Sequence, residues 1–214
     1  AQFDAVAVNP PYMGTRGYND SLKAFLLRTF SSARENVFAA FIEQSLRMTK
    51  GSGLASLVTM HNWMFLNRFQ QFRQELIEGR TIENLVHHGA GAFEEITGEV
   101  VQTASFTLRP KRLLGYSANF ISALELDGEK KSESIGGAGK KYVGDKQPTF
   151  ELISGGPIAY WLSEKFSSIF SGREMGDICE PREGLTTGSN VAYVRQWYEV
   201  SIHKIFFGAS DREA

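Results

Sequence analysis

The chain has 214 residues, of which 42% are hydrophobic and 22% are charged, and its formal charge at pH 7 is −1. This length allows one or two domains with a sizeable core, and the 16 phenylalanines favour a globular protein. A single cysteine, Cys179, excludes an internal disulfide framework and indicates a reducing compartment. We find no apolar run of membrane-spanning length and no signal peptide, so we expect a cytoplasmic protein without a membrane partner.

The near-neutral charge counts mildly against a nucleic-acid enzyme, because phosphate binding normally leaves a basic footprint. The basic residues are nevertheless uneven and form two groups, one at Arg109, Lys111 and Arg112 and the other at Lys130, Lys131, Lys140, Lys141 and Lys146. The second group is equally well explained as lysines on solvated loops.

The first element is an apolar strand over residues 3–8 that ends in Asn9-Pro10-Pro11-Tyr12. Two successive prolines remove two backbone donors and keep the preceding residues out of the α region, so the turn is stiff and its carbonyls stay free. A mobile loop is expected at 13–19, a helix at 21–30, and an amphipathic helix at 37–48 that Lys50-Gly51-Ser52-Gly53 ends.

Residues 54–60 are predicted to form a central parallel strand, buried on both faces, whose carboxyl end lies beside Asn9. A helix is expected over 63–78, then strands at 82–88 and 100–108 joined by 89–98. This order predicts an α/β fold of parallel strands with a terminal antiparallel strand.

Beyond residue 112 the composition shifts to Gly, Lys, Ser and Glu, so we place a domain boundary there. A flexible or β-containing connection with a strand at 118–126 is expected over 113–150. A mixed α+β region is expected over 151–214, with a helix that Gly155-Gly156-Pro157 opens and a strand at 204–207.

Two glycine-rich segments are not phosphate-binding loops. Residues 51–56 follow a helix and precede a strand, the reverse of the dinucleotide-binding context, and are predicted to be a connecting turn. In residues 134–141, Ser134 and Lys141 occupy positions where a phosphate loop needs Gly and Ser or Thr.

The histidines show no metal-ligand spacing, so no metal site is assigned. His87 and His88 should point to opposite faces of their strand. His61 is interpreted as a helix-entry residue, with substrate contact as the alternative.

Asn9-Pro10-Pro11-Tyr12 resembles the amino-methyltransferase signature of the class I S-adenosylmethionine enzymes. The resemblance implies that the Asn9 carboxamide and the Pro10 carbonyl accept the two N–H groups of an exocyclic amine, which favours a more reactive nitrogen in the transition state. It implies that Pro11 stiffens the turn, that Tyr12 stacks on a flipped base, and that Phe93 completes the base pocket. A core position for Phe93 is the alternative.

The resemblance further implies that residues 1–112 are the second half of a Rossmann-like class I methyltransferase sheet, followed by the start of a target-recognition region. Its cofactor is S-adenosylmethionine, which Asn9 would touch, but the family's glycine-rich cofactor turn precedes the Asn-Pro-Pro-Tyr strand and is absent here. We therefore expect the chain to be an inactive fragment whose catalytic domain needs a missing amino-terminal half.

The motif, Phe-Ala-Ala-Phe-Ile-Glu at 38–43 and residues 91–103 look like the large methyltransferase of the BREX and phage-growth-limitation defence systems. This implies adenine-N6 methylation of double-stranded DNA with a flipped adenine, in the bacterial cytoplasm, with other defence-system subunits as possible partners. Two alternatives stay open: a protein-glutamine N5 methyltransferase, and a non-catalytic DNA-binding or docking fragment without a cofactor site.

Overall fold

The computed structural model describes residues 1–90, 101–126, 137 and 139–172. These residues belong to one compact unit that ends at Gly172. Phe93, Cys179 and the strand expected at 204–207 lie outside the described residues. Among the described helices, none has the length and apolar character needed to cross a bilayer.

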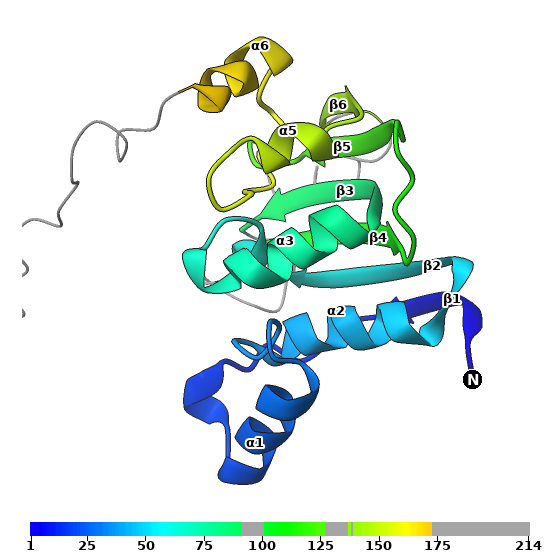
Figure 1. The fold of residues 1–214 in the computed structure, drawn as a ribbon, viewed down its shortest axis with the longest axis vertical. Helices are drawn as coiled ribbons and strands as arrows, with labels where there is room; N and C mark the ends of the chain where they lie inside the picture. Colours follow the sequence, from blue (N-terminus) through cyan, green and yellow to red (C-terminus); the bar gives the residue numbers. More distant parts are fainter. Residues whose placement is uncertain (91–100, 127–136, 138, 173–214) are drawn as a thin grey trace, which may run out of the picture. The chain divides into compact units, whose positions relative to one another are not determined.

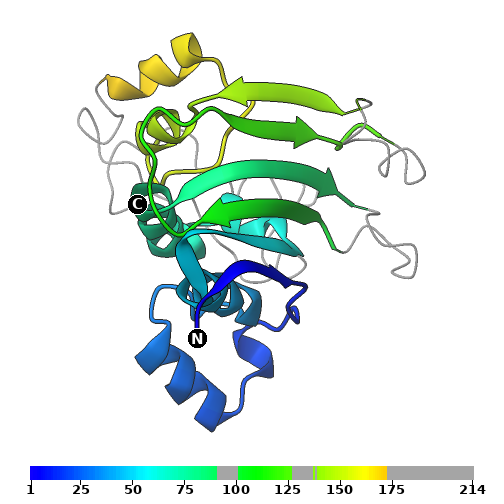
Figure 2. The same ribbon diagram turned by 90° about the vertical axis from the view of Figure 1, so that its right-hand side faces the viewer.

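The unit is built on a six-stranded sheet of order β1-β2-β4-β3-β5-β6. The strands are β1 (Phe3–Val8), β2 (Thr49–Met60), β3 (Thr81–Gly89), β4 (Thr103–Arg109), β5 (Ala118–Ser122) and β6 (Lys140–Gly144). β1 and β2 are parallel, and β4 lies antiparallel between β2 and β3. The carboxyl ends of β1, β2 and β3 therefore meet at one edge of the sheet (Figures 1 and 2). The predicted α/β fold of parallel strands with an antiparallel strand after them is confirmed.

The helices of the described ranges are α1 (Asp20–Thr29), α2 (Val37–Met48), α3 (Gln70–Gly79), α5 (Gln147–Glu151) and α6 (Glu164–Ser167). Of these, α2, α3 and α5 lie on one face of the sheet, whereas α1 lies beyond its β1 end and α6 beyond β5 and β6 (Figure 1). Short 3-10 turns occupy Thr15–Gly17, His61–Met64, Asn67–Phe69 and Ser168–Ser171. The first two helices begin where the side chains of Asn19 and Asn36 accept backbone N–H groups and so satisfy donors of the first turn.

The core lies between the sheet and these helices. Alternate residues of the central strands, such as Leu57, Leu85 and Phe106, are buried against the inner sides of α2 and α3, which contribute Phe38 and Phe72. This period-two alternation fixes the strand register, because a slip by one residue would move every apolar side chain to the other face.

Residues 51–56 were predicted to be a connecting turn, and this is wrong because they lie inside β2. The helix α2 passes directly into the strand, and the β1–β2 register shifts between the pairs Phe3–Thr49 and Ala5–Leu54, so the extra residues form a bulge. Gly53 is needed there, since a Cβ at this position would come within 2.5 Å of the Asp4 carbonyl oxygen.

Two helices expected from apolar spacing also differ. The helix predicted over 63–78 begins only at Gln70, after two 3-10 turns. No helix starts at Gly155-Gly156-Pro157, because both glycines adopt positive φ and the amide of Ile158 donates to Met64 O at 2.9 Å. The apolar side chains at 158–162 therefore belong to an irregular segment that packs against the core, and their spacing does not indicate a helix.

The sheet continues past residue 112. β5 pairs in parallel with β3, and β6 pairs antiparallel with β5. The functional division of the chain at 112 and 150 stays a prediction.

Candidate active site

The Asn-Pro-Pro-Tyr corner directly follows β1 at the carboxyl edge of the sheet. Pro10 is buried and anchors the turn, whereas Asn9 and Pro11 are exposed. Within the described residues, neither the Asn9 carboxamide nor the Pro10 carbonyl makes a hydrogen bond. The corner therefore presents two free oxygen acceptors on a stiff backbone.

Tyr12 is held beside the corner but is only half buried. Its ring meets Phe38 edge-on with centroids 6.3 Å apart, and its hydroxyl donates a long hydrogen bond to Val58 O at 3.4 Å. Burial raises the pKa of the phenol, so the hydroxyl stays protonated at neutral pH. The contacts with α2 and β2 thus fix the ring next to the free acceptors.

An open hollow of about 480 Å³ borders Asn9 on the face of the sheet that the described helices leave bare. Its walls include Ala7 of β1, Val58 of β2 and the hydrogen-bonded pair Ser56–Thr107, whose hydroxyl oxygens are 2.9 Å apart. Among the residues that the structure describes, no ionised side chain lines this hollow.

A chain of hydrogen bonds joins two strand ends at the same edge. His61 Nδ1 lies 2.7 Å from His87 Nε2, and His87 Nδ1 lies 3.1 Å from the Tyr160 hydroxyl. His87 and Tyr160 are buried. The ring of Phe65 lies 5.8 Å from that of His87, and the ring of Trp161 lies 5.1 Å from that of Tyr160. His88 points to the opposite face and meets Ser105 at 2.8 Å, so the predicted divergence of the two histidines is confirmed.

Burial keeps the three hydrogen-bonded side chains His61, His87 and Tyr160 neutral. Burial lowers the pKa of His61. The pKa of His87 is lowered to about 4, mainly by burial and in smaller part by repulsion from His61 and His88. The pKa of Tyr160 is raised to about 12, again mainly by burial. All three groups are therefore uncharged at neutral pH.

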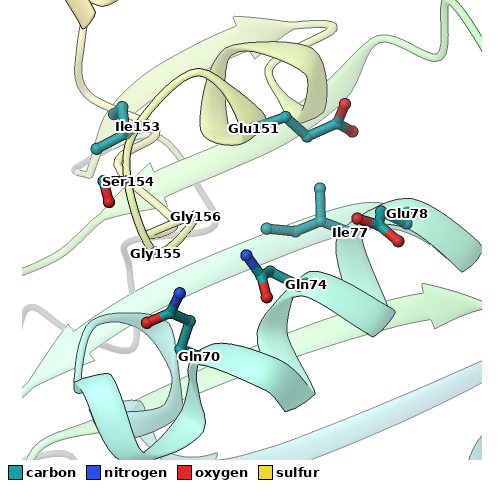
Figure 3. A pocket seen from close by; sticks show the side chains of 9 residues that line it. All are labelled: Gln70, Gln74, Ile77, Glu78, Glu151, Ile153, Ser154, Gly155 and Gly156. Atoms are coloured by element: carbon teal, nitrogen blue, oxygen red, sulfur yellow. The ribbon is translucent and has the colours of Figure 1, made fainter. Parts of the chain in front are cut away.

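The segment that carries Tyr160 is fastened by Arg73 of α3. Arg73 is 1% exposed, and its Nε lies 3.1 Å from Gly155 O and 3.0 Å from Gly156 O. Its Nη1 lies 2.9 Å from both Trp63 O and Leu66 O. Figure 3 shows the resulting turn facing Gln70 and Gln74 of α3 across a polar hollow of about 230 Å³, which involves none of the corner residues.

The sequence predicted a site at Asn9, Pro10, Pro11 and Tyr12. These residues form one corner at the carboxyl edge of the sheet, in which Asn9 and Pro11 are exposed, Tyr12 is half buried and Pro10 is buried, and their catalytic and binding roles stay a prediction. Phe93 lies outside the described residues. The His61–His87–Tyr160 chain was missed, because its three members come from distant parts of the sequence. One feature of the sequence could have indicated this contact: His61 follows β2 and His87 lies near the carboxyl end of β3, the next strand along the chain that runs parallel to it.

Residues 1–93 match the family model of the Eco57I restriction-modification methylases. The chain resembles these methylases. It is 35% identical over 215 residues to the adenine-specific methyltransferase PglX of Lacticaseibacillus casei (strain Zhang), with 97% of this chain and 18% of PglX covered. It is 33% identical over 204 residues to the adenine-specific methyltransferase BrxX of Escherichia coli O9:H4 (strain HS), with 94% of this chain and 17% of BrxX covered.

The chain thus spans less than a fifth of the length of these curated relatives. Among solved structures, it resembles the methyltransferase subunit of a type I restriction-modification system from Streptococcus thermophilus, with 24% identity and a TM-score of 0.45 over 59% of this chain and 27% of that one. The resemblance to class I adenine-specific methyltransferases, drawn from the Asn-Pro-Pro-Tyr motif, is confirmed.

Proposed function

We propose that the complete polypeptide carrying this chain transfers a methyl group from S-adenosylmethionine to the N6 amino group of adenine in DNA. The observation that carries the proposal is the pair of free acceptors at Asn9 and Pro10 beside the half-exposed ring of Tyr12. The names of PglX and BrxX, both adenine-specific methyltransferases, support adenine as the target.

In this proposal the corner binds the amine through its two N–H groups. The carboxamide oxygen of Asn9 accepts one and the carbonyl oxygen of Pro10 accepts the other. As the amine nitrogen donates its lone pair to the methyl carbon, it becomes pyramidal and positively charged. Its two N–H groups then become stronger donors, so these bonds strengthen in the transition state, and one of the two protons afterwards leaves to solvent. Preorganisation by the two prolines means that little reorganisation is needed at that moment.

Tyr12 supplies the face on which the base rests. An adenine inside a duplex cannot bring its amino group to a protein corner, so we propose that it is flipped out and stacks on this ring. Phe93, which follows β3 in sequence, is proposed as the second aromatic of the pocket.

The described residues fit S-adenosylmethionine only in part. Asn9 borders the 480 Å³ hollow, but the lining residues include no carboxylate to pair with the ribose hydroxyls. We therefore propose that an amino-terminal half of the catalytic domain supplies the glycine-rich turn and the acidic residue, and that the isolated chain binds the cofactor weakly. Residues 1–112 are proposed as the carboxyl-terminal half of that domain, and 151–214 as the start of the target-recognition region.

We further propose double-stranded DNA as the substrate, the bacterial cytoplasm as the location, and phage defence as the setting, with other defence-system subunits as partners. The similarity to PglX and BrxX supports this setting.

The test is product analysis. The complete polypeptide is incubated with duplex DNA and S-adenosylmethionine, and the nucleosides are separated after hydrolysis. N6-methyladenine is the expected product. Methyl groups found only on protein glutamine would instead support the alternative reaction, and failure of the complete polypeptide to bind the cofactor would support a docking role.

A further inference from the structure

We infer that residues 13–36, which leave the sheet directly after Tyr12 and return to it at Val37, form a clamp for the DNA phosphates that flank the target base. This inference rests on the proposed function, because DNA is taken as the substrate. The segment is called the basic excursion below.

The basic excursion has a net positive charge, whereas the rest of the chain has a net negative charge. It contains four cations, Arg16, Lys23, Arg28 and Arg34, against two carboxylates, Asp20 and Glu35. Its formal charge is therefore +2, which leaves −3 for all other residues together. A local positive charge beside a catalytic corner is the electrostatic footprint that phosphate contacts require.

The basic excursion is a built part of the unit and not a loose loop. Gly14 pairs with Asn36 as a β-bridge, and the amide of Val37 donates to Met13 O at 2.9 Å. Its helix α1 buries Leu26, and Ser32 Oγ donates to Glu75 of α3 at 2.6 Å. One end of the basic excursion is Met13, next to Tyr12, and the other end is Asn36, at the start of α2. Because these two ends are bonded together, the position of the excursion is fixed relative to the corner (Figure 1).

A hollow of about 400 Å³ on the basic excursion gathers groups suited to a nucleic-acid backbone. Lys23 and Arg34 supply the charges, and Thr15 and Tyr18 contribute hydroxyl-bearing side chains. Leu27, which is 52% exposed, adds an apolar surface for a sugar. Backbone contacts of this kind orient DNA without reading its sequence.

The cations are available for phosphates. Within the described residues Lys23 makes no ion pair, and Arg34 has only an exposed contact, with its Nε 3.5 Å from Glu35. The Tyr18 hydroxyl binds the Arg34 carbonyl at 3.1 Å, so it holds the backbone of Arg34 and leaves the guanidinium free to move. Glu35 is the opposing charge in this hollow and should weaken phosphate binding.

The test measures the salt dependence of DNA affinity with the complete polypeptide. Log Kd for a fluorescent duplex is plotted against log salt concentration for the wild type and for Lys23→Gln/Arg34→Gln. Each lost phosphate contact lowers the slope by about 0.9, so the double variant should lose about 1.8. Affinity at 0.1 M salt should fall roughly tenfold to a hundredfold, equally for all sequences.

Two single variants serve as controls. Lys111→Gln removes an exposed lysine that follows β4 at the opposite edge of the sheet, and it should leave slope and affinity unchanged. Glu35→Gln removes the opposing charge and should tighten binding. Both altered residues of the double variant are exposed, so circular dichroism should show an unchanged fold.

An unchanged slope in the double variant would overturn the clamp, as would an equal loss with Lys111→Gln. Loss of a protein subunit from the double variant at unchanged DNA affinity would also overturn it and would assign this surface to a protein partner. If the wild type methylates DNA while the slope is insensitive to both cations, the clamp fails and the proposed function stands. If DNA binding depends on Lys23 and Arg34 but no N6-methyladenine forms, the clamp stands and the proposed function fails.

Discussion

Removal of the Arg73 guanidinium should release the segment that carries Tyr160 and should leave the Asn-Pro-Pro-Tyr corner in place. Arg73→Met retains much of the apolar volume but removes the guanidinium donor from the carbonyl groups of Trp63, Leu66, Gly155 and Gly156. The Leu66 carbonyl keeps a second donor, the amide of Phe69 at 3.0 Å. Each lost bond to a charged donor costs about 1 kcal/mol or more, so we expect a loss of about 3–5 kcal/mol. Burial lowers the pKa of Arg73 to about 10, which still leaves it charged at neutral pH.

Hydrogen exchange read by mass spectrometry localises this effect in the complete polypeptide. The amide of Ile158, bonded to Met64 O, should exchange two to three orders of magnitude faster in Arg73→Met, since about 1.4 kcal/mol corresponds to a factor of ten. Arg73→Lys keeps the charge without the planar fork and should fall between the two. Arg68→Met is the matched control, because Arg68 is exposed and its guanidinium lies over the ring of Phe69 at 5.3 Å. Protection within tenfold of the wild type in Arg73→Met would refute the reasoning.

Two further predictions concern stability. The pKa of His87 is lowered from 6.5 to about 4, because the folded state disfavours its protonation. The contribution of neutral His87 to the free energy of unfolding is therefore complete above pH 6.5 and is lost as the pH falls towards 4. This loss of unfolding free energy is about 3 kcal/mol. Chemical denaturation at pH 7 and pH 4 should show it in the wild type but not in His87→Gln. An equal loss in His87→Gln would contradict the assignment to His87. Gly53→Ala should cost about 1–3 kcal/mol, because its Cβ would meet Asp4 O at 2.5 Å and Thr49 Cγ2 at 2.8 Å. Gly51→Ala, which meets nothing within 4 Å, should leave the thermal midpoint unchanged, and equal midpoints for the two variants would argue against the clash.

The sequence was sufficient for the parts of the fold that local pattern determines. Period-two alternation and apolar spacing located β1, α2, β3 and β4 to within a few residues, and the Asn-Pro-Pro-Tyr string located the corner. Proline stiffness is a local property, so a stiff corner whose Asn9 and Pro10 oxygens lack partners among the described residues could be predicted from the sequence, whereas the burial of Pro10 depends on the surrounding fold.

The errors fell where long-range contacts override local preference. Glycines at 51 and 53 suggested a turn, yet pairing with β1 makes them a bulge. Residues 155–166 had helical spacing, but carbonyl bonds to Arg73, 82 or more residues away, hold Gly155 and Gly156 in another conformation. The pairing of His61 with His87 likewise depends on strand order, which spacing along the sequence does not encode.

We propose that Asn9 binds the reacting amine more strongly in the transition state than in the bound ground state. This proposal is tested most directly by single-turnover methylation with Asn9→Ala in the complete polypeptide, run beside Lys111→Gln as the control. We expect the methylation rate constant to fall by about 10²–10³ while the Kd for DNA changes less than threefold. A Kd raised a hundredfold with a normal rate constant would contradict the account, because Asn9 would then bind DNA and not the transition state.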